Sequence, residues 1–366
     1  MAVYKLFPEK DATLYSEYPA MNTGIDEILE ATTSKTLAGV PVVSRYLIKF
    51  SQSSILDVMN NKVTGSTAIY LKNYIAKVEG LAQDTLIYCF PISGSWQNGT
   101  GKYLNSPATE NGVSWAFRTT SGSTAWQTGS FTTGATASWS GSIYGGGNWY
   151  TASIYAQSQS FEYRSIFDIN YNVTNTVLAW YSGSIVNDGF IVKQQDEAEF
   201  NLDRLVEFKY FSVDTNTIYP PELEFKWNDY TFNTGSSVQT IIQNPQLVIS
   251  ISNNKGTYEP EAIQRFRLNS RPQYPARIFT TSSFYTTNYY LPTSSYWSLV
   301  DLDTNEVIVD FDNTYTKISA DSTSSYFDIY MNGLEPERYY KLLFKIILGG
   351  NTQILDDSYY FKVINK

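Results

Sequence analysis

The sequence predicts an all-β protein with more than one domain, and three observations support this prediction. The chain has 30 Tyr, 20 Phe and 8 Trp among 366 residues, and aromatic side chains suit half-buried pleated surfaces. Short segments alternate apolar and polar residues with a period of two, which is typical of strands. A hydrophobic content of 42% can fill real cores, and the length is suited to two or three domains.

The composition also limits the chemistry. The chain has no histidine and one cysteine. Histidine is the usual proton shuttle and metal ligand near neutral pH, and its absence excludes Ser-His-Asp and Cys-His arrangements. A single cysteine forms neither an internal disulfide nor a metal cluster. We therefore expect no catalytic residue, no metal ligand and no cofactor-binding residue.

The charge pattern narrows the range of partners. The net charge is −9, and the basic residues are scattered rather than clustered. Nucleic acids and anionic membrane surfaces select clustered cations, so neither is expected as a partner. Residues 1–10 lack the apolar core of a signal peptide, and no stretch approaches the length of a membrane span. We expect synthesis in the cytoplasm without membrane insertion.

The N-terminal half begins with strands around one short helix. Arg45–Phe50 and Thr67–Tyr74 alternate cleanly, and Ser53 or Ser54 can cap a helix between them. Gly65 is expected to end the connection. The apolar face of the predicted helix is formed by Ile55, Leu56, Val58 and Met59.

Further along, two strands are predicted and one segment stays open. Cys89 lies in the apolar segment Thr85–Phe90 and is expected to be buried as a small hydrophobe. Leu223–Trp227 alternates as a strand, whereas Asp196–Phe208 fits a helical or an extended structure equally well.

Residues 93–160 differ from the rest of the chain, since they are rich in Gly, Ser, Thr and Trp and almost free of charge. Such a segment suits long loops laid over a sandwich. Its aromatic residues have two interpretations: they form an interaction surface for a protein or a sugar, or they pack as lids on the domain beneath. The candidate residues are Trp115, Trp126, Tyr144, Trp149 and Tyr150.

A second domain is predicted from residue 245 to the C-terminus, after a turn-like linker at 233–244. Hairpins are expected at Asp303–Glu306 and Gly349–Thr352. Asn332–Tyr340 reads as a turn that enters a strand beginning with tyrosines, as in immunoglobulin-like sandwiches. The predicted strands are Gln246–Ser252, Ile263–Leu268, Ser295–Asp301, Glu306–Asp310, Tyr326–Met331, Tyr339–Leu348 and Tyr359–Val363.

Several acidic segments are candidates for glycoside hydrolysis or calcium binding. Asp196–Glu199 and Asp356–Asp357 are the densest pairs, and their positions beside turns favour a solvated surface over glycoside hydrolysis. Asp301–Asn305 and Asn187–Asp188 carry oxygen ligands suited to calcium, although the first also fits a hairpin turn. Gly145–Gly147 lacks the Lys-Ser/Thr of a nucleotide-binding loop and indicates a turn.

An ordered set of short motifs in residues 1–232 resembles a DNRLRE-type β jelly-roll domain. The resemblance implies a jelly roll, with residues 93–160 as an insertion longer than that family usually carries. The motifs are Lys10–Tyr15, Asn22–Gly24, Glu27–Ala31, Ser44–Phe50, Thr67–Leu71, Trp180–Gly183, Asn187–Lys193 and Pro221–Phe225.

The whole chain is also similar to virion structural proteins of tailed bacteriophages of the T4-like marine type. These proteins join such a jelly roll to an immunoglobulin-like β-sandwich, here residues 245–366. The resemblance implies a non-enzymatic subunit of the head accessory layer, neck or tail, located in a virion assembled in the host cytoplasm. Its partners would be other virion proteins and copies of itself. The alternative is a carbohydrate-binding module that recognises a host surface glycan.

Overall fold

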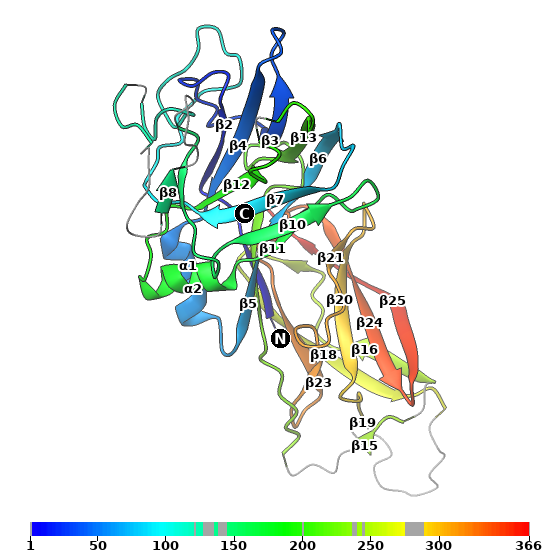
Figure 1. The fold of residues 1–366 in the computed structure, drawn as a ribbon. Coiled ribbons are helices and arrows are strands. Elements are labelled where there is room, and N and C mark those ends of the chain that lie inside the picture. Colours follow the sequence, from blue (N-terminus) through cyan, green and yellow to red (C-terminus); the bar gives the residue numbers. More distant parts are fainter. Residues whose placement is uncertain are drawn as a thin grey trace, which may run out of the picture. The chain divides into compact units, whose positions relative to one another are not determined.

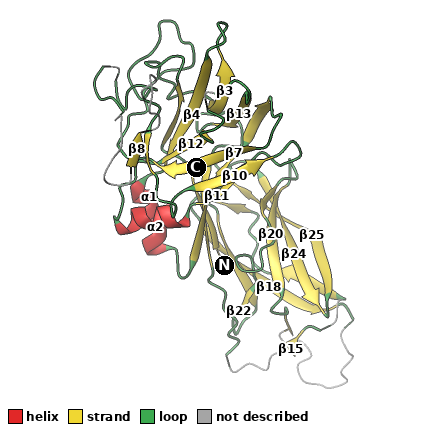
Figure 2. Ribbon diagram, in the orientation of Figure 1, coloured by secondary structure: helices red, strands yellow, loops and turns green. Residues whose placement is uncertain are grey.

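The computed structural model confirms the all-β prediction, with 44% of residues in strands and 6% in helices (Figures 1 and 2). The chain divides into two compact units: a larger unit of residues 6–62 and 68–224, and a smaller unit of residues 1–5, 63–67 and 225–366. The structure describes residues 2–120, 122–126, 135–137, 145–199, 201–235, 240–243, 246–274 and 289–365.

The chain passes between the two units at four points, and three of these points lie within strands. These strands are β1 (Ala2–Leu6), β5 (Thr67–Asn73) and β14 (Glu222–Trp227). The strand predicted at Leu223–Trp227 is therefore confirmed as β14.

The larger unit is built on a curled antiparallel sheet of eight strands in the order β10-β7-β12-β4-β3-β13-β6, with β2 paired to β4. Two further pairs are antiparallel: β5 with β11 (Ile169–Asn172), and β8 (Ala135–Ala137) with β9 (Asn148–Tyr150). The bounds of the eight strands are β2 Lys10–Tyr15, β3 Ile28–Lys35, β4 Pro41–Lys49, β6 Ile75–Glu79, β7 Thr85–Pro91, β10 Gln157–Phe161, β12 Phe190–Gln194 and β13 Val206–Phe211.

Strand β4 determines which side chains face which core. Its first residues pair with β3, and its remaining residues pair with β2. Because side chains alternate along a strand, Tyr46 faces one side and Arg45 and Leu47 face the other. Tyr46 packs 5.7 Å from Tyr210 and accepts a hydrogen bond from Asn73 at 2.8 Å. Leu47 belongs to a separate cluster that is rich in tryptophan.

Two helices follow β4 and β11. Helix α1 (Gln52–Asn61) buries Ile55 and Val58 as expected, but its N-cap is Ser51 rather than Ser53 or Ser54. Ser51 keeps extended backbone angles while its hydroxyl faces the amide of Ser54, so the helix begins earlier than predicted. Helix α2 (Thr174–Ser182) was not predicted, because most of its residue types have low or middling helix propensity.

The structure answers two questions from the sequence: the conformation of Asp196–Phe208 and the environment of the single cysteine. Residues 196–199 form turns, and the chain is extended in β13, so the described residues of Asp196–Phe208 form no helix. Cys89 lies in β7 and is buried, which confirms its predicted role as a small hydrophobe.

The smaller unit is a two-sheet sandwich. One sheet contains β16, β18 and β23, and the other has the order β17-β25-β24-β20-β21. This division, with β16, β18 and β23 in one sheet and β20, β24 and β25 in the other, is typical of immunoglobulin-like sandwiches. The first sheet also holds short strands β15, β19 and β22. The bounds are β15 Thr240–Ile241, β16 Leu247–Ile251, β17 Thr257–Tyr258, β18 Ile263–Pro272, β19 Tyr289–Tyr290, β20 Ser295–Asp301, β21 Val307–Val309, β22 Ser319–Ala320, β23 Ser325–Tyr330, β24 Tyr339–Leu348 and β25 Asn351–Val363.

Both predicted hairpins of this unit are confirmed. β20 and β21 pair antiparallel across Asp303–Glu306, and β24 and β25 pair across Gly349–Thr352. Tyr340, near the start of β24, donates its hydroxyl hydrogen to the carbonyl of Glu335 at 3.0 Å. This is the tyrosine corner that the sequence of Asn332–Tyr340 suggested.

Candidate functional site

Three of the aromatic residues singled out by the sequence are core residues. Trp115, Trp126 and Trp149 are 1%, 3% and 5% exposed, so they do not form an exposed interaction surface. Tyr150 is half-buried, and Tyr144 lies outside the described residues. The packing interpretation therefore describes the three tryptophans, because a buried ring offers no face to a sugar or a partner.

The tryptophans cover the outer face of strands β2, β4 and β12. Two indole N–H groups hold the covering loops: Trp126 donates to the carbonyl of Ser114 at 3.0 Å, and Trp96 donates to that of Asp188 at 2.8 Å. We call this group the tryptophan cluster. Its buried residues are Ala12, Leu14, Val43, Leu47, Ile92, Trp96, Val113, Trp115, Trp126, Trp149 and Ile191.

The glycine run beside this cluster is shaped by close packing. Gly145 has a φ of +101°, and a Cβ atom there would lie 2.1 Å from the carbonyl oxygen of Trp115. The amide of Gly146 donates to the same oxygen at 2.6 Å. The chain therefore needs glycine here for a close backbone approach, in agreement with the predicted turn.

A buried ion cluster lies within the tryptophan cluster. The Arg45 guanidinium donates to both carboxylate oxygens of Glu199, at 2.8 and 2.5 Å, and to the carbonyl of Gly146 at 2.9 Å. It also lies 5.0 Å from the ring centre of Trp115 and 5.4 Å from that of Trp149. A bidentate, fully desolvated pair of this kind requires several hydrogen bonds to offset its desolvation.

Lys193 completes the ion cluster. Its ammonium lies 3.1 Å from Glu199, donates to the carbonyl of Gln194 at 2.9 Å and pairs with Asp196. The predicted solvated role of the acids at 196–199 is wrong for Glu199, whose side chain is 1% exposed. The arrangement fixes loop positions and leaves the carboxylate without access to a substrate.

The calcium candidates are occupied by internal contacts. Asp301 accepts backbone hydrogen bonds from Asp303 and Thr304 and pairs with Arg338, as a hairpin turn requires. Asp188 accepts from the amide of Gly94 at 2.9 Å. Within the ranges that the structure describes, no group of three or more acidic or cysteine side chains is placed to hold a metal ion.

A surface groove over β3, β4 and β13 is the best candidate binding site, and no sequence motif indicated it. It encloses about 140 Å³. We call it the Tyr103 groove. It is lined by Tyr15, Glu17, Glu30, Thr32, Ser34, Val42, Val43, Ser44, Tyr103, Glu207 and Lys209.

The chemistry of the Tyr103 groove combines an aromatic wall with charged groups. The ring of Tyr103 lies 4.7 Å from that of Tyr15 and keeps 42% of its surface exposed. Lys209 lies 3.3 Å from Glu30 and 3.3 Å from Glu207. Burial raises the pKa of the Glu30 carboxyl, and the charge of Lys209 opposes that rise. A ring face next to hydrogen-bonding carboxylates suits a hydroxyl-rich ligand.

The groove escaped sequence analysis because its residues are far apart in the chain, from Tyr15 to Lys209. Four strands (β2, β3, β4 and β13) and two loops bring them together, and none of these segments has a distinctive spacing. The alternation of β13 was hidden within the open segment at 196–208, so Glu207 and Lys209 could not be assigned to one face.

Neither of the comparisons made with known proteins identifies a relative. A scan against protein-family models finds no match, and a search of curated proteins finds no significant similarity. In the described part of the chain, no helix is long and apolar enough to cross a membrane.

Proposed function

We propose that this chain is a non-enzymatic structural subunit of a tailed-bacteriophage virion, located in the head accessory layer, neck or tail. It acts through contacts with other virion proteins and with copies of itself, and it assembles in the host cytoplasm. The proposal rests first on the resemblance of the whole chain to such subunits.

One structural observation supports an assembly role: large apolar side chains are exposed on ordered turns. Tyr163 is 83% exposed in a turn closed by the hydrogen bond from the Ser165 amide to the Glu162 carbonyl, at 2.9 Å, and Ile166, directly after this turn, is 81% exposed. Exposed aromatic and aliphatic residues on rigid supports are suited to protein contacts, and symmetry multiplies a modest contact into a stable array.

The proposal is tested by locating the protein in purified particles. Antibody labelling in electron micrographs, with quantitative mass spectrometry, should find it at a fixed copy number that matches a symmetry of the head, neck or tail. Detection only in the lysate and never in purified particles would contradict the proposal.

The Tyr103 groove favours a second candidate, a carbohydrate-binding module for a host surface glycan. The partly exposed aromatic residue Tyr103 lines this groove together with the polar residues Glu30, Glu207 and Lys209. This arrangement supports recognition of a saccharide ring through stacking and hydroxyl contacts.

A glycan array followed by titration calorimetry tests this candidate. Tyr103→Ala should weaken binding at least tenfold, whereas the matched change Tyr163→Ala, at an exposed tyrosine away from the groove, should leave it unchanged. Absence of binding across the array, or equal loss in both variants, would remove the candidate.

A further inference from the structure

The hairpin between β3 and β4 ends in an ordered tip that displays apolar side chains. The amide of Thr36 donates to the carbonyl of Val40 at 2.9 Å, and that of Gly39 donates to the carbonyl of Thr36 at 2.9 Å. Leu37 is 112% exposed and Val40 is 54% exposed. We call residues 36–40 the Leu37 tip. The turn therefore displays one leucine and one valine side chain to solvent.

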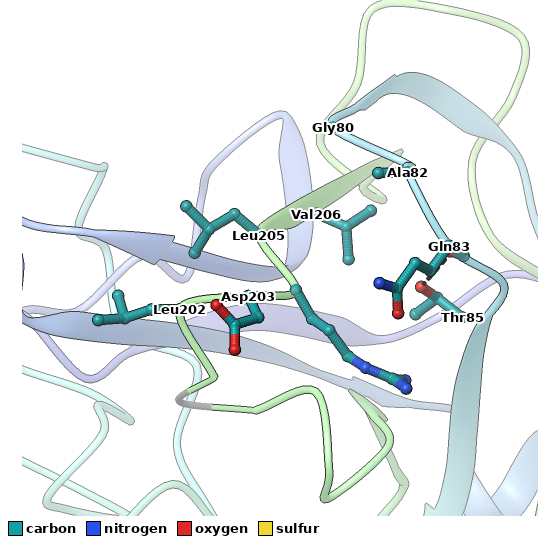
Figure 3. A pocket seen from close by; sticks show the side chains of 9 residues that line it. Gly80, Ala82, Gln83, Thr85, Leu202, Asp203, Leu205 and Val206 are labelled. Atoms are coloured by element: carbon teal, nitrogen blue, oxygen red, sulfur yellow. Dashed lines mark hydrogen bonds between the residues drawn. The ribbon is translucent and has the colours of Figure 1, made fainter.

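A cavity of about 240 Å³ lies in the same unit (Figure 3). In Figure 3, Gln83 lies in the connection between β6 and β7, and Thr85 begins β7. Leu202 comes from the segment before β13, and Val206 begins β13. We call it the Leu205 pocket. Its lining residues are Gly80, Ala82, Gln83, Thr85, Leu202, Asp203, Arg204, Leu205 and Val206.

The Leu37 tip and the Leu205 pocket lie at the same end of one sheet. Val206, in the pocket wall, pairs directly with Thr33 of β3. Leu37 follows Thr33 by four residues, a reach of about 13 Å along an extended chain. The same end of the sheet therefore carries an apolar projection and a hollow lined by both apolar and polar side chains. A two-fold axis through this end of the sheet places each projection at the partner's hollow.

The charges around the two features are complementary in part, because the pocket is lined by both Asp203 and Arg204. Lys35 at the base of the tip is exposed, and among the described residues no acidic side chain pairs with it. Asp203 at the pocket and the neighbouring Asp84 are exposed acids. A copy seated with its tip in the pocket would bring Lys35 toward these carboxylates.

The pocket carries a hydrogen-bond donor, and the tip carries backbone acceptors. The half-buried Arg204 guanidinium lines the pocket, and the tip uses the carbonyls of Thr36 and Val40 in its own turn. The carbonyls of Leu37 and Ala38 receive no hydrogen bond from the described residues, so each can accept one from a donor such as a guanidinium.

We propose that the Leu37 tip of one copy docks into the Leu205 pocket of a second copy, and that the contact is reciprocal about a two-fold axis. The proposal rests on the assembly role proposed above and names its partner and surface. Burial of Leu37 and Val40 supplies the apolar contact, and Lys35 with Asp203 sets the orientation.

Cysteine cross-linking of mixed variants tests the contact. Leu37→Cys is mixed with Leu202→Cys under mild oxidation, and a disulfide-linked heterodimer is expected. The control mixes Leu37→Cys with Leu178→Cys, at an exposed leucine of α2, and should give none. The native Cys89 is buried and does not compete. Equal cross-linking of both mixtures, or none in the first, overturns the proposal.

Self-association separates this proposal from the assembly role itself. In sedimentation velocity, the purified protein should dimerise, Leu37→Asp should weaken the dimer at least tenfold, and Leu178→Asp should leave it unchanged. If Leu37→Asp associates as well as the wild type, the tip contact is wrong while assembly through another surface stands. Absence from purified virions would instead contradict the assembly role alone.

Discussion

The two units solve the problem of packing aromatic residues in different ways. In the smaller unit, Trp297, Phe327 and Phe344 lie on facing strands, and Trp297 stacks on Phe327 at 5.3 Å. In the larger unit, three of the four tryptophans of the tryptophan cluster, Trp96, Trp115 and Trp126, come from loops, and the cluster encloses an ion cluster of Arg45, Lys193 and Glu199. The comparison teaches that strands position apolar rings by alternation alone, whereas loops here are held by hydrogen bonds and buried charges.

The largest effect is expected from a substitution in the core of the smaller unit. Trp297→Ala should lower the free energy of unfolding by about 3–5 kcal/mol, because the side chain is 1% exposed and its removal leaves a cavity. Urea unfolding followed by circular dichroism measures this. A loss below about 1 kcal/mol would mean that the ring is not part of a closed core.

The next largest effect is expected from a substitution in the ion cluster inside the tryptophan cluster. Glu199→Gln should cost about 3 kcal/mol, since Arg45 and Lys193 then stay buried with less compensation. The matched double variant Arg45→Met/Glu199→Leu should lose less than the single one, because an apolar pair replaces the ion pair. Equal stability of Glu199→Gln and wild type in urea would show that the ion cluster is open to water.

The two units also differ in the pKa of an aspartate, which makes the stability of the protein depend on pH. Burial raises the pKa of Asp11 in β2 to about 8, while the amide of Val213 opposes that rise. The unfolded state has the lower, ordinary value, so this contribution to stability is full below about pH 4 and is lost as pH rises through 8. In the smaller unit, burial would raise the pKa of Asp301, but Arg338 and backbone amides hold it below its usual range.

Asp11→Asn should therefore remove part of the pH dependence of unfolding. The wild type should lose about 2–4 kcal/mol between pH 5 and pH 8 from this group, and the variant should be the more stable protein at pH 8. Urea titrations at both pH values measure the difference. Parallel pH profiles for the two proteins would contradict a buried, protonated Asp11.

The smallest expected effect concerns the corner of the smaller unit. Tyr340→Phe removes the hydrogen bond to the Glu335 carbonyl and should cost about 1 kcal/mol. Tyr360→Phe, at an exposed tyrosine of β25, is the control and should change the midpoint of urea unfolding little. Identical midpoints for both variants would remove the corner as a stabilising feature.

More elements of the smaller unit than of the larger one could be predicted from the sequence. The bounds of β20 and β24 match the predicted ranges, because alternation and short hairpin turns are local properties. The tyrosine corner was also visible locally. Helix α2 and the cap at Ser51 were missed, since tertiary packing rather than propensity determines them.

The site residues were harder to predict, for a physical reason. Arg45 stands in a strand at a position where alternation predicts an exposed polar residue, yet it is buried, and its partner Glu199 is 154 residues away. Nothing in either local sequence shows that the two meet. The Tyr103 groove has the same origin, because its carboxylates and rings converge only after β3, β4 and β13 pair.

The most direct test of this account is hydrogen exchange at the indole N–H groups of Trp96 and Trp126, followed by nuclear magnetic resonance and assigned with Trp→Phe variants. Both groups donate to buried carbonyls, so the account predicts exchange far slower than that of an exposed indole. Exchange of both groups at the rate of a free indole would contradict it, because the tryptophans would then form an open surface rather than a core.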